Sequence, residues 1–203
     1  MDFQWQLRPA EMVLRAAFAT LGCSGGVFTD GNYATMWNAA ADRFVSEGRL
    51  NELRQALCPI YDIWDADALG RWAPRPGAAD LLGRLQRGNM SLGMVSNIGR
   101  TALNEALERF NFADCLSPIV SRDDVSYMKP RAEGILRVLT EWRLTPDEVL
   151  FVGDSMADVA GARAAGIAVA IIRGGECEES VFAFNLPDHM ISQLDELVEL
   201  LAE

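Results

Sequence analysis

The sequence is poor in the residues on which several common chemistries depend. It has a single histidine, His189, ahead of a short strand-like segment over residues 190–192, so a histidine-based mechanism has little to build on. The four cysteines show no paired spacing, so the sequence predicts neither a zinc site nor a disulfide framework. We expect all four to be reduced. Three would be small apolar residues, namely Cys23, Cys58 and Cys115, and Cys177 would lie in a polar loop.

Long apolar runs and basic stripes are also missing. Apolar residues make up 50% of the 203 residues, but no run approaches the length of a membrane span, and the polar start does not resemble a signal peptide. The formal net charge is −11, which argues against nucleic acid and anionic membranes as partners. We therefore expect a cytoplasmic protein without a membrane or nucleic-acid partner. Such a protein would attract an anionic substrate only locally, through cations and helix N-termini.

The apolar pattern that is present predicts strands alternating with helices. Residues 23–32 are glycine-rich and predict a loop. The spacing of apolar residues predicts helices over 9–21, 33–45, 50–57, 76–87, 101–110, 131–142, 158–165 and 194–201, and strands over 92–97, 116–121, 149–152 and 169–172. Strands separated by helices are typical of a parallel sheet with right-handed crossovers, so the fold class is α/β and Rossmann-like.

The most informative segment is Val149–Ala162, in which a strand stops at a glycine and a helix begins. Asp154 leaves the predicted strand at its carboxyl end, where open α/β sheets bind ligands. Asp158 lies one helical turn further on the same side. Two carboxylates so placed suit Mg²⁺, which binds a few carboxylates, waters and a substrate phosphate. The alternative is that Asp154 or Ser155 caps the helix and Asp158 is a solvated acid in its first turn.

Two upstream segments add a hydroxyl and a cation. Ser96 and Asn97 end the strand predicted over 92–97, and Lys129 precedes Pro130 at the start of another helix. Since each lies in a loop next to a predicted strand or helix start, these groups and the two acids could converge on one phosphate. Taken separately, Ser96 is more often a helix cap and Lys129 more often a solvated side chain.

From about Arg75 onward, the chain resembles the haloacid dehalogenase-like hydrolase superfamily, in its phosphatase branch of phosphoglycolate phosphatase-like proteins with a helical cap. Ser96-Asn97 resembles the second family motif, Lys129-Pro130 the third, and Gly153-Asp154-Ser155 with Asp158 the fourth. The resemblance implies residues 1–74 as a small helical cap with a short N-terminal segment over 1–8, and residues 75–203 as the α/β core.

The resemblance also implies roles for these residues. Ser96 and Lys129 would act in catalysis, Ser96 by donating a hydrogen bond to a phosphoryl oxygen and Lys129 by neutralising charge. The backbone amide of Asn97 would bind the same group. Asp154 would bind Mg²⁺, and Asp158 would hold the waters of the metal or the lysine. Charge stabilisation and positioning of this kind dominate phosphoryl transfer.

The first family motif, a strand followed by Asp-x-Asp-Gly-Thr that supplies the nucleophile, is missing from the N-terminal part of the chain. Residues 2–7 contain one acid, with Gln4 where the second should be, although their alternation would allow a short strand. In the family this strand lies at the centre of the sheet, between those ending at Ser96 and Asp154, so it is expected to be absent or replaced here. The explanations are a truncated chain, which we favour, a catalytically inactive descendant, or a nucleophile from another chain.

Three functions follow from these observations. The first is a Mg²⁺-dependent phosphatase of small phosphorylated metabolites that is truncated or inactive as given. The second is a non-catalytic phosphate- or metabolite-binding protein, or a regulatory partner, on the same fold. The third is a 2-haloacid dehalogenase, which would not need the two metal-site acids. The cap of this family selects the substrate and carries no general code, so the substrate stays open.

Overall fold

The computed structural model describes residues 7–175 and 179–201. Cys177 and most of the segment proposed as a short strand, residues 2–6, therefore lie outside the described residues. Leu7, the end of that segment, is the first residue of a helix. Among the described helices, none is both long enough and apolar enough to cross a lipid bilayer.

The N-terminal part consists of helices, as predicted, with two corrections. Helix α2 lies inside the segment predicted to be a loop, and α4 continues well past the predicted end at residue 57. The helix continues through Pro59 because buried residues recur along one side of it as far as Ala68 and Leu69. The bounds are α1 Leu7–Thr20, α2 Val27–Asp30, α3 Tyr33–Ser46 and α4 Leu50–Leu69.

The remainder alternates strands and helices, which confirms the α/β class. Short 3-10 turns over residues 113–115, 122–124, 146–148 and 179–184 join the elements. The bounds are α5 Ala78–Arg87, β1 Met94–Val95, α6 Arg100–Arg109, β2 Ile119–Val120, α7 Glu133–Trp142, β3 Leu150–Gly153, α8 Met156–Ala164, β4 Ala168–Ile172, β5 His189–Ile191 and α9 Glu196–Leu200.

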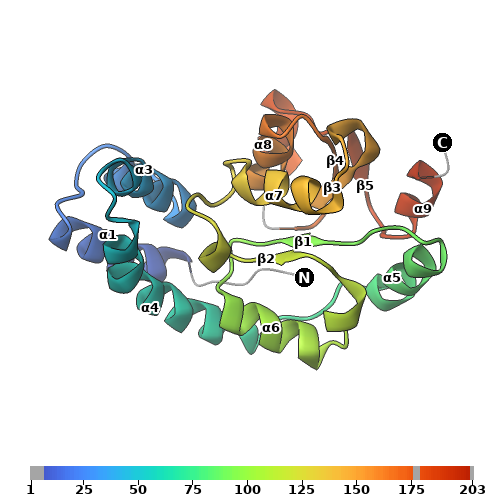
Figure 1. Ribbon diagram of the computed structural model, residues 1–203, viewed down its shortest axis with the longest axis horizontal. Helices are drawn as coiled ribbons and strands as arrows, with labels where there is room; N and C mark the ends of the chain where they lie inside the picture. Colours follow the sequence, from blue (N-terminus) through green and yellow to red (C-terminus); the bar gives the residue numbers. More distant parts are fainter. Residues whose placement is uncertain (1–6, 176–178, 202–203) are drawn as a thin grey trace.

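The strands form two parallel sheets instead of one. β1 pairs with β2, while β3, β4 and β5 pair in that order, and no described strand joins the two sheets. The registers place Met94 opposite Ile119 in the first sheet and Leu150 opposite Ala168 in the second. The strands predicted over 92–97 and 116–121 are two residues each, although backbone hydrogen bonds between the two segments continue from Ser117–Leu92 to Ser96–Val120. Figure 1 shows β1 and β3 in the middle of the molecule, with the helical part at one end.

The two sheets leave a cavity of about 580 Å³ that β1, β3 and their neighbouring loops line. The backbone N–H groups of Met94 and Ser96 point to the β2 side, where they donate to Pro118 and Val120. The intervening residue, Val95, therefore has its carbonyl on the opposite edge. On β3, the Val152 residue is 41% exposed, which is unusual for an apolar residue in the middle of a strand. Among the described residues, no strand lies between β1 and β3, the position at which the sequence analysis expected the central strand to be absent or replaced.

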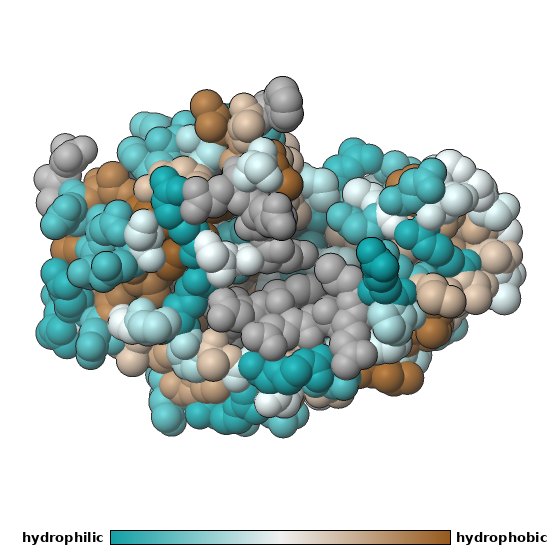
Figure 2. Space-filling model, turned by 180° about the vertical axis from the view of Figure 1, so that it is seen from behind, coloured by the Kyte–Doolittle hydropathy of each residue, from teal (hydrophilic) through white to brown (hydrophobic). Residues whose placement is uncertain are grey.

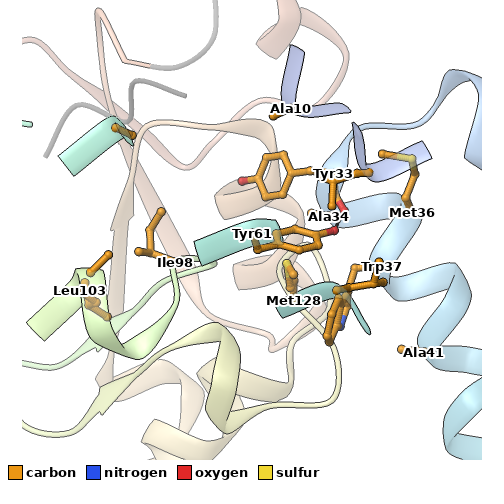
Figure 3. Packing of buried hydrophobic residues seen from close by; sticks show 14 of the residues in the cluster. Ala10, Tyr33, Ala34, Met36, Trp37, Ala41, Tyr61, Ile98, Leu103 and Met128 are labelled. Carbon is orange, nitrogen blue, oxygen red and sulfur yellow. Dashed lines mark hydrogen bonds between the residues drawn. The ribbon is translucent and has the colours of Figure 1, made fainter. Parts of the chain in front are cut away.

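One hydrophobic cluster joins the helical part to the α/β part. It includes Trp37 and Tyr61 from α3 and α4, Ile98 and Leu103 from the segment after β1, and Met128. Figure 3 shows Met128 beside Tyr61 and Trp37, whose rings meet edge to face with centroids 5.7 Å apart. On the face shown in Figure 2, hydrophilic residues are interspersed with small hydrophobic patches. The apolar core that supports the loops at the end of β1 is therefore shared with the helices.

Candidate functional site

The five residues singled out from the sequence line one cavity. Ser96 and Asn97 follow β1, and Lys129 lies in the loop before α7. Asp154 leaves β3, and Asp158 lies in the first turn of α8. Each of the five contributes to the walls of the cavity between the two sheets. The structure therefore brings together loops that are far apart in the sequence.

Lys129 is the centre of the arrangement. Its ammonium Nζ donates to Asp158 Oδ1 at 2.7 Å and to the carbonyl of Val95 at 2.9 Å. The ammonium also lies 5.4 Å from the centre of the Phe151 ring on β3. The side chain thus spans from β1 to β3 and α8. This excludes the alternative of a freely solvated lysine.

Asp158 is 5% exposed and has both carboxylate oxygens engaged. Besides the bond from Lys129, Oδ2 accepts from the N–H groups of Asp154 and Ser155 at 3.1 Å and from Ser155 Oγ at 2.7 Å. Ser155 and Asp158 form a capping box at the start of α8, which confirms Ser155 as a cap. The same alternative expected Asp158 to be a solvated acid, which is wrong because Asp158 is buried. Burial alone would raise the pKa of Asp158, but the charge of Lys129 and the hydrogen bonds hold it below its usual value. Asp158 is therefore an ionised partner of the lysine.

Asp154 differs from Asp158 in its surroundings. Burial and the nearby charge of Asp158 raise the pKa of Asp154, and Arg75, with Nη2 3.4 Å from Oδ2, opposes the rise only in part. A Cβ at Gly175 would overlap the Asp154 side chain, so the glycine allows the chain to pass close to this carboxylate. Among the described residues, Asp154 accepts from fewer donors than Asp158, and its raised pKa shows that its ionised form is the less stabilised of the two.

The donor set suits magnesium, but only in part. Mg²⁺ is commonly bound through one or two carboxylates together with waters and substrate phosphates, which the Asp154 carboxylate at the mouth of a strand could begin to satisfy. Within the described ranges, no group of three or more His, Cys, Asp or Glu residues could hold a metal. Asp158 would have to exchange one of its hydrogen bonds to bind a metal directly, so it fits the role of holding the lysine better.

Ser96 and Asn97 have separate roles in the loop after β1. Ser96 Oγ accepts from the N–H of Ile98 at 3.2 Å, and no acceptor for its own proton is found among the described residues. The Asn97 side chain pairs with the backbone of Lys129: Nδ2 donates to its carbonyl at 3.0 Å, and Oδ1 accepts from its N–H at 2.9 Å. The Asn97 side chain therefore positions the lysine, a role that the sequence did not predict.

A buried ion pair beside this loop was missed from the sequence. Arg122 is 1% exposed, and its Nη1 donates to Asp65 Oδ2 on α4 at 2.8 Å. Asp65-Ala66-Asp67 is the sole Asp-x-Asp in the sequence, but it lies within a helix, and exposed Asp67 pairs with Arg71. It therefore does not have the strand-end setting of a nucleophile motif. No sequence signal distinguished Asp65 from the other helical acids, because only the fold brings Arg122 to it.

Comparison with known proteins identifies relatives. The family model of the haloacid dehalogenase-like hydrolases matches residues 18–172. A phosphoglycolate phosphatase from Salmonella typhi is 34% identical over 126 residues, which are 62% of this chain and 50% of that protein. A phosphoglycolate phosphatase from Escherichia coli K12 is 32% identical over 127 residues, with the same shares covered. The chain thus spans about half the length of the curated relatives it matches.

Solved structures share the fold. A hydrolase from Pseudomonas syringae superposes with a TM-score of 0.66 and 18% identity, over 99% of this chain and 95% of that one. A haloacid dehalogenase superfamily hydrolase from Geobacter sulfurreducens gives a TM-score of 0.60 and 19% identity, over 94% and 90% of the two chains. At these identities the similarity concerns the fold alone.

Proposed function

Because the chain belongs to the haloacid dehalogenase-like hydrolases, we propose that its site serves the Mg²⁺-dependent hydrolysis of small phosphate monoesters. The observation that carries the proposal is the contact of Lys129 with Asp158 at 2.7 Å, in a cavity that Ser96 and Asp154 also line. A held ammonium, a hydroxyl and a carboxylate that favours a cation form a set suited to a phosphoryl group. Their charges and donors match the needs of phosphoryl transfer, which depends on positioning and charge stabilisation.

Each residue has a defined part in this proposal. Ser96 Oγ and the backbone N–H of Asn97 donate to phosphoryl oxygens, and Lys129 neutralises their charge. Asp154 would hold the Mg²⁺, which when bound supplies further charge neutralisation. Asp158 keeps Lys129 in place. Asn97 does the same through the lysine backbone.

The nucleophile is the missing part. In the proposed reaction a carboxylate oxygen attacks phosphorus and the bond from phosphorus to the ester oxygen breaks, while the second acid of the Asp-x-Asp motif gives its proton to the leaving alcohol. Water then loses a proton to that second carboxylate and attacks the acyl phosphate, which releases inorganic phosphate and regenerates the first carboxylate. The described residues hold no carboxylate at the end of a strand between β1 and β3. We infer that such a carboxylate comes from a strand placed in the cavity between the two sheets, where Lys129 would meet it.

For the substrate, we propose a small phosphorylated metabolite, with phosphoglycolate as the first candidate, since relatives of that name are 34% identical. We assign residues 1–74 as a cap over the site, and the acidic net charge of −11 fits a cytoplasmic enzyme that does not bind nucleic acid. A non-catalytic phosphate-binding protein is the second candidate, favoured by the lack of a strand-end carboxylate. The two metal-site acids argue against a 2-haloacid dehalogenase.

The proposal is tested with a protein extended by an upstream strand that ends in Asp-x-Asp-Gly-Thr. We expect it to hydrolyse a panel of small phosphate esters, including phosphoglycolate, with Mg²⁺ but not with chelator. Asp154→Asn serves as the control and should remove the activity. An extended protein that folds and binds phosphate yet hydrolyses no ester would favour the binding protein. Release of halide from 2-haloacids without Mg²⁺ would favour the dehalogenase.

A further inference from the structure

Two buried polar side chains of the N-terminal helices contact the loops that carry the site. The buried polar or charged residues of the described chain are Asn38, Asp65, Ser121, Arg122, Ser155 and Asp158. Of these, Asn38 on α3 is 6% exposed and Asp65 on α4 is fully buried. Both bind backbone groups of loops in the α/β part, one in Ser126–Lys129, the lysine loop, and the other in Ser96–Gly99, the serine loop.

The Asn38 side chain binds both backbone groups, the N–H and the carbonyl, of Met128, the residue before the lysine. Its Nδ2 donates to the Met128 carbonyl at 2.9 Å, and its Oδ1 accepts from the Met128 N–H at 2.8 Å. Asn97 binds Lys129 in the same two-bond manner. Two consecutive residues are thus held by two asparagines, one from the helical part and one from the α/β part.

The lysine loop lies between the described helices and strands, and side chains from α3 and α7 hold its backbone. Glu133 accepts from the N–H groups of Ser126 and Tyr127, each at 2.9 Å, which satisfies the remaining backbone donors of the loop. Trp37 on α3 donates from Nε1 to the Ser126 carbonyl at 2.9 Å. The side chain of Met128 is 1% exposed and packs in the shared core (Figure 3). Helix α3 thus fixes both ends of the Ser126–Met128 segment.

Asp65 makes a corresponding contact with the serine loop. Its Oδ2 accepts from the Gly99 N–H at 2.9 Å and from Arg122 Nη1 at 2.8 Å. The backbone N–H of Arg122 donates in turn to the Ile98 carbonyl at 3.0 Å. A Cβ at Gly99 would overlap the Arg122 guanidinium, so this close approach requires glycine.

We propose that Asn38 and Asp65 are positioning residues of the phosphate site, through which α3 and α4 hold the lysine loop and the serine loop in their binding arrangement. The inference rests on the proposed function for its purpose, but its contacts stand independently of it. The helical part then does more than cover the cavity. The site is assembled only while α3 and α4 are seated, because each loop has backbone groups that would lose their buried partners if the helices moved away.

The sequence provides a selective readout, because Lys129 is its only lysine. Acetylation by acetic anhydride, followed by mass spectrometry of the peptide that contains Lys129, reports how well the ammonium is held. The variants are Asn38→Leu, which removes both bonds to Met128, and Asn38→Asp, which keeps the acceptor should the first fail to fold. Tyr61→Phe is the matched control, because it removes the buried hydrogen bond that the Tyr61 hydroxyl donates at 2.7 Å to the Tyr33 carbonyl, between α4 and α3, and keeps the ring beside Met128.

We expect acetic anhydride to modify Lys129 about tenfold faster in Asn38→Leu than in the unchanged protein, since the variant loses two buried hydrogen bonds that hold the loop. Hydrogen exchange should quicken in residues 126–129 for this variant and in residues 97–99 for Asp65→Asn. Tyr61→Phe should change neither the acetylation of Lys129 nor the hydrogen exchange of either loop, even if its denaturant midpoint falls as much as that of Asn38→Leu. Unchanged acetylation in both Asn38 variants and unchanged exchange of both loops would overturn the proposal.

Inorganic phosphate with Mg²⁺ separates this proposal from the proposed function. If the site binds phosphate, phosphate should slow acetylation of the unchanged protein, and higher concentrations should be needed in Asn38→Leu and Asp65→Asn. Protection at the same concentration in all proteins would overturn the positioning role. No protection of the unchanged protein would contradict the proposed function, while the acetylation and exchange without phosphate would still decide the roles of Asn38 and Asp65.

Discussion

At the scale of single residues, the environment of Lys129 decides its chemistry. The ammonium has two fixed acceptors, Asp158 Oδ1 and the Val95 carbonyl, and its backbone is held by Asn97. A lysine on a flexible stem would lose rotamer entropy each time it bound a phosphate. This lysine is ordered before a ligand arrives, which favours binding.

Replacing the lysine should therefore abolish phosphate binding. In the unchanged protein, phosphate with Mg²⁺ at about 100 times its Kd should add about 2.7 kcal/mol to stability by mass action. Lys129→Ala should lose most of this shift and should itself cost about 3 kcal/mol, because Asp158 is left buried without its cation. Differential scanning fluorimetry measures both effects.

Arg131→Ala is a suitable control, since Arg131 lies two residues away but forms an exposed pair with Asp42. It should retain the phosphate shift. Equal shifts in Lys129→Ala and the unchanged protein would mean that the lysine does not contact phosphate.

Replacing Asp154, in contrast to replacing Lys129, should stabilise the fold while it removes the binding of Mg²⁺. Burial and the charge of Asp158 raise its pKa in the folded protein, so its ionised form destabilises the fold. The penalty is absent below the unfolded pKa, grows as pH rises toward the folded pKa, and is full above it. Asp154→Asn should thus be more stable than the unchanged protein near neutral pH, with the difference vanishing in acid.

Urea denaturation from pH 3 to 8, without added metal, measures this difference. The same variant should gain no stability from Mg²⁺. A variant that is less stable at neutral pH would show that the interaction with Arg75 outweighs burial and the repulsion by Asp158.

At the scale of elements, no strand in the described part of the chain pairs with both β1 and β3. A central parallel strand of about five or six residues would pair with both and bury side chains on both faces. Each buried Val, Leu or Ile would contribute about 1.5–3 kcal/mol. A protein extended by such a strand should therefore be more stable by several kcal/mol, as measured from urea midpoints.

A matched extension with alternate apolar residues changed to serine controls for chain length. It should give no increase in stability. Equal stability of the short and the extended protein would mean that the cavity between the sheets is already filled in another way.

At the scale of the whole molecule, binding and catalysis should be separable. A protein of these 203 residues should show no turnover of an aryl phosphate with Mg²⁺, because no carboxylate within residues 7–175 and 179–201 is placed at a strand end between β1 and β3 to form the phosphoryl intermediate. A steady-state assay with Asp154→Asn as the control measures this. Turnover by the short protein that disappears in Asp154→Asn would reveal a nucleophile elsewhere.

The sequence by itself determined the α/β class, the alternation of elements, and five of the residues that line the cavity. These follow from local rules: apolar periodicity marks the elements, and parallel strands carry their carboxyl ends to one side, so Ser96 and Asp154 had to lie at one edge. Ser155 was also among the predicted caps of the helix, although Asp158 is buried and not the solvated acid that this alternative expected. Neighbours in the sequence were enough for each of these inferences.

Only the tertiary structure decided how these groups are paired. In the tertiary structure Lys129 contacts Asp158, and the Asn97 side chain binds the backbone of the lysine. Asn38 and Asp65 from the helices bind the two loops. It also divided the strands into two sheets. Such contacts connect residues distant in the chain, and their strength depends on burial and on the alignment of donors with acceptors, which a sequence pattern does not record.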